Sequence, residues 1–203
     1  LGAVGDLHLV IRKERIADDL LVIAGDNLLE LDFAALHGDF RRRGASLVVL
    51  RRMEPGPLIR QYSVVTLDGE GRITAFEEKP ANPKSNLIAI CLYLFHGKDL
   101  HLVDRYIREG NNPDAPGYYI QWLHKVAPVY GHVFDGAWFD IGSIGAYNEA
   151  NRVWGERFGG GEDVATGARG GPTGAPRTPA GPRRGCRPGG SAGGPPRRPS
   201  AAP

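Results

Sequence analysis

The stretch that decides the fold runs from residue 20 to residue 50 and reads LLVIAGDNLLELDFAALHGDFRRRGASLVVL. It begins with a continuous aliphatic run at 20–24, which is typical of a short strand buried on both faces of a parallel sheet. The pattern then predicts a helix at 33–43, closed by Gly44, and a second strand at 46–50. Together they predict a βαβ unit with a right-handed crossover.

Further elements follow on both sides of this unit. Apolar residues with helical spacing predict an amphipathic helix at 6–15. Downstream, the patterns predict strands at 62–67, 72–77, 87–95, 129–134 and 137–140, and helices at 100–109, 118–125 and 144–158. The tight connection near residue 70 makes the topology mixed. We therefore expect an α/β fold, a Rossmann-like mixed and mainly parallel sheet flanked by helices.

Composition divides the chain near Phe158. Residues 159–203 hold 13 Gly and 9 Pro, nearly half of that segment, and they show no hydrophobic period. Such a segment cannot bury enough apolar surface to offset the conformational entropy that ordering costs. We expect a folded domain at 1–158 and a disordered Gly/Pro/Arg-rich tail at 159–203.

Charge divides at the same point. The tail carries seven Arg against Glu162 and Asp163, so it contributes +5 to a total of +2 and leaves −3 on residues 1–158. A mildly acidic body argues against nucleic acid as a partner of the globular part, which would need a basic face. RNA binding by the tail is a minor alternative to a bland linker, because the tail has no aromatic residues for bases to stack on.

The remaining composition bears on location. Cys91 and Cys186 form neither a metal-ligand spacing nor a disulfide framework, so a reducing, cytoplasmic location is expected. No apolar run approaches the roughly 20 residues that span a bilayer, so no membrane partner is expected. The chain begins at Leu1 rather than Met and reads as a fragment. The sequence leaves the oligomeric state open, and a homo-oligomer is compatible with it.

Three acidic positions lie at the ends of predicted strands. Asp26 comes directly after the first strand and Gly25, at the edge where such sheets bind ligands, although a strand-end Asp is about as often a turn former. Glu78 and Lys79 follow another strand, where a solvated charge cluster is the simpler interpretation. Asp140 interrupts an apolar run, and a divalent cation is one way to keep such an acid charged.

In this order the segments resemble the sugar-1-phosphate nucleotidylyltransferase family, in particular its glucose-1-phosphate thymidylyltransferase type. The resemblance covers residues 1–157 and rests on five motifs in order: Gly-Asp-Asn at 25–27, Glu-Glu-Lys-Pro at 77–80, Ser-Asn at 85–86, Asn-Asn-Pro-Asp-Ala-Pro-Gly-Tyr at 111–118, and the segment from Val133 to Gly142. Residues 1–5 also resemble the small-residue segment that faces the nucleotide base in that family. The resemblance implies a nucleotide-diphospho-sugar transferase fold.

The resemblance also implies roles for single residues. Asp26 and Asp140 match the two aspartates that hold a catalytic Mg²⁺. Glu78 matches the acid that binds sugar hydroxyls. Lys79 matches the lysine that binds the sugar phosphate, and the resemblance implies that it is also a catalytic residue. Asn86 lies in the sugar-binding strand segment, and Gly2 lies near the base. The implied partners are a nucleoside triphosphate, expected to be dTTP, and a sugar 1-phosphate, expected to be glucose 1-phosphate.

The chain departs from the family pattern in several places. The first strand and the glycine-rich loop that hold the triphosphate are missing before Leu1, so we expect this chain alone not to synthesise the NDP-sugar. Ser63 stands where the family usually has glycine, and Ile90-Cys91 replaces a frequent Thr-Gly or Val-Gly, which puts sugar specificity in doubt. A non-catalytic relative that binds a sugar nucleotide or regulates another subunit remains the alternative.

Overall fold

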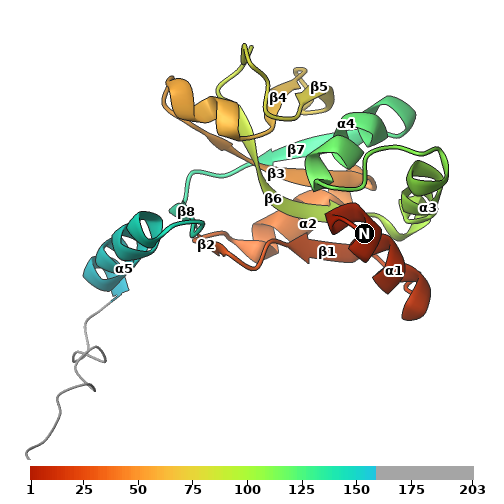
Figure 1. Ribbon diagram of the computed structural model, residues 1–203, viewed down its shortest axis with the longest axis horizontal. Helices are drawn as coiled ribbons and strands as arrows, with labels where there is room; N and C mark the ends of the chain where they lie inside the picture. The colour runs from red at the N-terminus through yellow and green to blue at the C-terminus, as the bar shows by residue number, and fades with distance from the viewer. Residues whose placement is uncertain (159–203) are drawn as a thin grey trace, which may run out of the picture. The chain divides into compact units, whose positions relative to one another are not determined.

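The computed structural model describes residues 1–158 (Figure 1), so the predicted disordered tail lies outside the described residues. The helices are α1 (Ala3–Lys13), α2 (Phe33–Arg43), α3 (His101–Arg108), α4 (Pro116–Val126) and α5 (Ile144–Phe158), with short 3₁₀ turns η1 (Pro57–Gln61) and η2 (Gly97–Asp99). The strands are β1 (Leu20–Ile23), β2 (Asn27–Leu29), β3 (Ser46–Arg52), β4 (Val64–Leu67), β5 (Ile73–Glu77), β6 (Leu87–Phe95), β7 (Val129–Val133) and β8 (Trp138–Asp140).

Six of these strands form one mixed sheet. Its order is β5-β4-β6-β3-β7, and β1 joins it through β6. The strand β6 pairs antiparallel with β1, β3 and β4, whereas β3 and β7 pair in parallel. The mixed sheet with flanking helices is therefore confirmed. Four strands run in one direction: β1, β3, β4 and β7. The strand β6 pairs with three of them and runs in the opposite direction, so most neighbouring pairs are antiparallel.

The predicted βαβ unit needs one correction. Its two strands, β1 and β3, do run in the same direction, with α2 between them in sequence. They are not neighbours, because β6 pairs with both of them and lies between them. The physical reason is that β6 is a nine-residue, almost wholly buried strand, which is long enough to serve β1, β3 and β4 along its length.

Helices cover both faces of the sheet. Strand residues alternate between the two faces, so Val48 and Leu50 point to one core and Leu47 and Val49 to the other. The first core also takes apolar side chains from α1, α3 and α4, which Figure 1 shows gathered at the right of the view. The second core takes Leu36 and Phe40 from α2. This two-sided burial holds the carboxyl ends of the strands in fixed positions.

Local signals set the limits of α2. The Asp32 carboxylate accepts hydrogen bonds from the backbone N–H groups of Ala34 and Ala35, both at 2.9 Å, and so caps the N-terminus. Gly44 ends the helix in the left-handed conformation, with φ 58°. Both ends match the prediction from sequence.

A second, two-stranded sheet lies apart from the main one. The strands β2 and β8 pair antiparallel, with Asn27 opposite Asp140 and Leu29 opposite Trp138. The helix α5 follows β8 and lies beside it at the left of Figure 1. Within residues 1–158, none of the helices is both long and apolar enough to cross a membrane.

Candidate active site

The two-stranded sheet brings Asp26 and Asp140 together from positions far apart in the chain. Asp26 lies in the turn before β2, and its backbone carbonyl accepts a hydrogen bond of 2.8 Å from the N–H of Ile141. Asp140 ends β8 opposite Asn27. Asp26 is the residue just before β2. The alternation of side chains along a strand therefore does not place its carboxylate on the face of the sheet opposite to that of Asp140. Both acids therefore lie at the same end of the β2–β8 sheet.

The two carboxylates affect each other electrostatically. Partial burial and, second, the negative charge of Asp26 raise the pKa of Asp140. Two like charges in adjacent positions favour either a shared proton or a cation. Residues 1–158 contain no group of three or more His, Cys, Asp or Glu side chains arranged to hold a metal ion. A cation at this pair would therefore take its other ligands from water or substrate.

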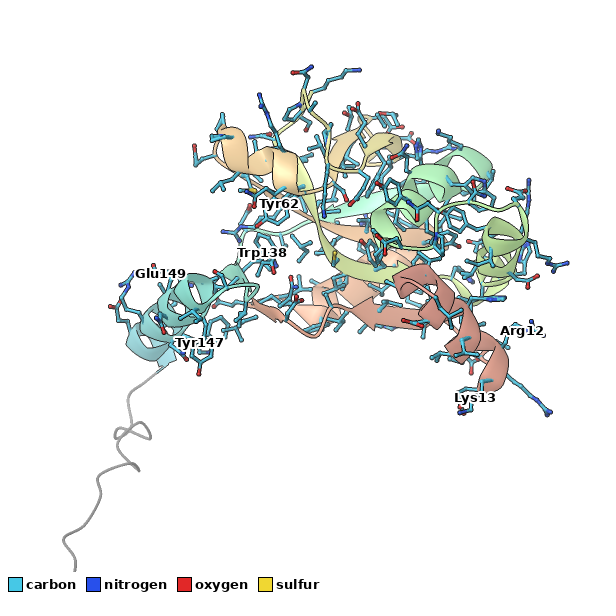
Figure 2. All side chains as sticks on the ribbon, viewed as in Figure 1. Arg12, Lys13, Tyr62, Trp138, Tyr147 and Glu149 are labelled. Carbon is cyan, nitrogen blue, oxygen red and sulfur yellow. The ribbon has the colours of Figure 1, made fainter. Side chains whose placement is uncertain are left out.

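An amide and two aromatic rings support the acid pair. The side-chain amide of Asn27 donates to Asp26 Oδ1 at 2.9 Å, and its oxygen accepts from Trp138 Nε1 at 2.5 Å. Trp138 in turn meets Tyr62 edge-on, with ring centroids 5.5 Å apart, and both are labelled in Figure 2. Burial and the charge of Asp140 raise the pKa of Tyr62. These contacts tie Asp26 to β8 and to the segment before β4.

Glu78 is held by contacts from two other elements. Its Oε2 accepts a short hydrogen bond from Ser63 Oγ, and its backbone N–H donates to Gln121 Oε1 at 3.2 Å. Gly117, near the N-terminus of α4, leaves room for this carboxylate, since a Cβ there would lie 2.6 Å from Cδ of Glu78. The carboxylate is thus fixed between β4, β5 and α4.

Lys79 follows Glu78 with an unusual backbone conformation. Its φ is 45°, in the left-handed region that residues other than glycine seldom adopt. The side chain is exposed, and in the described part of the chain it forms no ion pair or hydrogen bond. The turn therefore sends the backbone away from the strand at Lys79 while Glu78 stays partly buried.

Cys91 of β6 is within electrostatic range of all three acids. Burial raises the pKa of its thiol, and the charges of Glu78, Asp140 and Asp26 raise it further, while the Tyr93 hydroxyl acts in the opposite direction. The Cys91 side chain is nonetheless exposed, so protein atoms surround it on some sides and water reaches it on another. One thiol thus senses acids from three separate parts of the sequence.

The other two predicted site residues lie further out. Asn86 directly precedes β6. Its side-chain Nδ2 donates to the backbone carbonyl of Met53 at 3.2 Å, and its backbone carbonyl accepts from the Met53 N–H at 2.9 Å. Gly2 caps α1 with φ 73°, and a Cβ there would lie 2.7 Å from Cα of Asp114. No hydrogen bond within residues 1–158 joins either residue to the three acids.

Sequence reasoning missed several supporting residues. Gln121, Gly117 and the Asn27 side chain had no assigned role, and Ser63 counted only as a departure from the family pattern. The signal for Gly117 was present, because a glycine directly after a proline at a helix start is a poor helix former that needs a packing reason. No sequence signal identifies Gln121, because its contact depends on how α4 packs against β5.

Comparison with known proteins identifies the family of this chain. The model of the nucleotidyl transferase family matches residues 2–156. A glucose-1-phosphate adenylyltransferase of Thermomicrobium roseum is 33% identical over 139 residues, which are 66% of this chain and 32% of that protein. One of Thermotoga neapolitana is 30% identical over 150 residues, 71% and 35% of the two chains. The chain spans about a third of the length of these curated relatives.

Solved structures share the fold. A UDP-glucose pyrophosphorylase in complex with UDP-glucose superposes with a TM-score of 0.65 at 18% identity, covering 77% of this chain and 62% of that one. A Bacillus anthracis structure assigned to a glucose-1-phosphate thymidylyltransferase gives 0.60 at 23% identity, over 75% and 60% of the chains. From the family match and these relatives, the chain belongs to the nucleotidyl transferase family, among its sugar-1-phosphate nucleotidylyltransferases.

Proposed function

We propose that this chain carries the sugar-phosphate side of an enzyme that joins a nucleoside triphosphate to a sugar 1-phosphate and releases pyrophosphate. The observation that supports this most is the pairing of β2 with β8, which brings Asp26 and Asp140 to one end of that sheet. These are the acids that the family resemblance assigns to the metal. Asp26 and Asp140 come from separate segments, so their approach is a property of the fold.

The sugar phosphate binds to Glu78 and Lys79. The Glu78 carboxylate, fixed by Ser63, has remaining lone pairs that accept hydrogen bonds from sugar hydroxyls. The exposed Lys79 ammonium supplies a point charge for the phosphate. Its left-handed backbone conformation supports a functional role, because strained residues of this kind cluster at ligand sites.

Asp26 and Asp140 fit a divalent cation. They provide hard oxygen ligands, and burial and then the charge of Asp26 raise the pKa of Asp140, both of which a cation would counteract. Mg²⁺ held by these two carboxylates would neutralise phosphate charge. The protein's own contribution is to position the sugar phosphate so that its oxygen meets the α-phosphorus opposite the departing pyrophosphate.

Glucose 1-phosphate is the proposed sugar substrate, because the curated relatives are named for it. For the base, the sequence motifs favour dTTP, whereas those relatives are named adenylyltransferases and one structural neighbour holds UDP-glucose. The three possible product NDP-sugars differ in their base, so their affinities discriminate between the bases without requiring turnover. We propose dTTP on the motifs and compare the binding of dTDP-glucose, ADP-glucose and UDP-glucose to the full chain by calorimetry.

The test of the sugar site is glucose 1-phosphate binding, measured by calorimetry with Mg²⁺ present. Lys79→Ala and Glu78→Gln should each weaken binding by about tenfold or more, since a charge-assisted contact is worth roughly 1.5 to 3 kcal/mol. Glu77→Gln is the matched control, because Glu77 pairs with Lys84 at 3.8 Å and has no assigned contact with substrate. Equal affinities in all three variants would exclude this site.

A further inference from the structure

Ser63 and Glu78 form a cross-strand pair at the end of the β4–β5 ladder. The last pair of that ladder joins Val64 to Glu77, so each of the two residues is one position further along. Opposite residues of an antiparallel pair have their side chains on the same face of the sheet. The backbone carbonyl of Ser63 also accepts a hydrogen bond of 3.0 Å from the N–H of Ala89, which joins this position to β6. The sheet therefore holds the serine hydroxyl beside the carboxylate.

The Ser63 hydroxyl occupies one oxygen of this carboxylate. Ser63 is 9% exposed, and its Oγ donates a short hydrogen bond to Oε2 of Glu78. The first turn of α4 closes the same space, since a Cβ at Gly117 would collide with Oε2 and would lie 2.7 Å from Ser63 Oγ. Oε2 is therefore enclosed by the serine on one side and by the α4 backbone on another.

Oε1 is the oxygen that remains for a ligand. Within residues 1–158, Oε1 of Glu78 accepts no hydrogen bond and joins no ion pair, and the residue as a whole is only half-buried. A free carboxylate can accept from two neighbouring hydroxyls, one at each oxygen, because each oxygen has two lone pairs. A carboxylate with one oxygen held by a serine presents only the other.

We propose that Ser63 is a positioning residue that sets how many sugar hydroxyls Glu78 recognises. With Ser63 in place, Glu78 accepts from one hydroxyl, through Oε1. Without the serine hydroxyl, the carboxylate turns about its terminal bond and accepts from two neighbouring hydroxyls. This inference rests on the proposed function, which assigns Glu78 to the sugar.

The test measures which hydroxyls of the sugar the full chain recognises. Calorimetry with Mg²⁺ present gives the affinity for glucose 1-phosphate and for each of its monodeoxy analogues, and the ratio of the two is the penalty for that missing hydroxyl. Comparison with Glu78→Ala identifies the hydroxyls that depend on Glu78. In the wild-type chain, one hydroxyl should carry a penalty of about fivefold or more that Glu78→Ala abolishes.

Ser63→Ala removes the hydroxyl and keeps the Cβ. In this variant the penalty for a second hydroxyl, adjacent to the first on the sugar ring, should rise from nearly none to about fivefold or more. Ser63→Gly should have the same effect, and it provides a second variant should alanine impair folding. A serine with a purely structural role would change the stability of the chain and leave this pattern of penalties as it is.

Ser46→Ala is the matched control. Ser46 is the other buried serine of the described residues, 1% exposed, and it lies at the first residue of β3, where its Oγ accepts from the N–H of His96 at 3.1 Å. This control should lower the midpoint of urea unfolding without changing any penalty. Ser63→Ala should lower the midpoint in the wild-type chain and much less in the Glu78→Ala chain, which shows the coupling without any ligand.

Three results overturn the inference while the proposed function stands. One is a set of penalties in Ser63→Ala and Ser63→Gly that matches Ser46→Ala. Another is a wild-type chain in which Glu78 already recognises two hydroxyls. The third is an equal shift of the unfolding midpoint with and without Glu78. Failure of the proposed function looks different, because the wild-type chain would then bind no glucose 1-phosphate, and the inference would fall with it.

Discussion

Gly117→Ala should disturb Glu78 while leaving the rest of the fold intact. A Cβ at this position would lie 2.6 Å from Cδ of Glu78 and 2.7 Å from Ser63 Oγ, well inside ordinary van der Waals contact. The carboxylate is at the end of a flexible side chain, so it can swing away. Doing so breaks its hydrogen bond with Ser63.

The expected change in unfolding free energy follows from two opposing effects. Loss of a hydrogen bond to a charged group costs about 1.5 to 3 kcal/mol. Alanine in place of glycine within α4 returns up to about 1 kcal/mol of helix propensity. The net loss is therefore about 0.5 to 2 kcal/mol, measured by urea unfolding.

Gly38→Ala is the control, because Gly38 lies within α2 and a Cβ there meets nothing within 4 Å. That variant should be stabilised by about 0.5 to 1 kcal/mol. In a Glu78→Ala background the main clash is absent, so Gly117→Ala should no longer destabilise, which reveals coupling between the two sites. If Gly117→Ala stabilises the wild-type chain as Gly38→Ala does, the reasoning about this close approach is refuted.

Three other outcomes are expected. Burial alone would raise the pKa of Asp39, but hydrogen bonds from His132, Arg42 and Arg43 and the charge of Arg43 lower it; Asp39→Asn should cost about 1 to 3 kcal/mol at neutral pH. Because the folded-state pKa is depressed, this difference should disappear as pH falls below the usual carboxyl range, and a difference that persists in acid would contradict the assignment. Asp32→Ala should cost about 1 kcal/mol in urea unfolding by removing the cap of α2, whereas no loss would mean that solvent replaces the cap. Burial and neighbouring carboxylates raise the pKa of Cys91. Its reaction rate with iodoacetamide should therefore still increase above the usual thiol pKa of about 8.5, at pH values where the rate of an ordinary thiol has levelled off. A plateau in the rate at that pH would count against the raised pKa.

The sequence predicts the main elements because their patterns are strong. The helix α2 has a cap at each end, and β6 is a nine-residue apolar strand, and both occupy the predicted residues. The three-residue strand β2 was missed, since three residues carry no period that can be recognised. Position in the sheet was also misjudged, because no local pattern indicates that β6 lies between β1 and β3.

The sequence likewise predicts some features of the candidate site and misses others. Motifs identify Asp26, Glu78 and Asp140 as residue types suited to metal and sugar. The approach of Asp26 to Asp140 depends on the pairing of β2 with β8, and the exposure of Cys91 depends on the bulge in β6; both are long-range features. The contact of Gln121 with Glu78 depends likewise on the packing of α4 against β5. The roles of these residues in catalysis and binding stay predictions.

Backbone strain links the fold to the site. Within residues 1–158, three residues other than glycine have positive φ, and two of them, Lys79 and Cys91, lie at the candidate site. A left-handed conformation costs such a residue roughly 1 kcal/mol or more compared with glycine. Cys91→Gly should relieve this strain and raise the free energy of unfolding by roughly 1 kcal/mol. Urea unfolding of the Cys91→Gly and wild-type chains measures the difference in stability. A Cys91→Gly chain that is no more stable than the wild type would show that the left-handed conformation at Cys91 stores no strain.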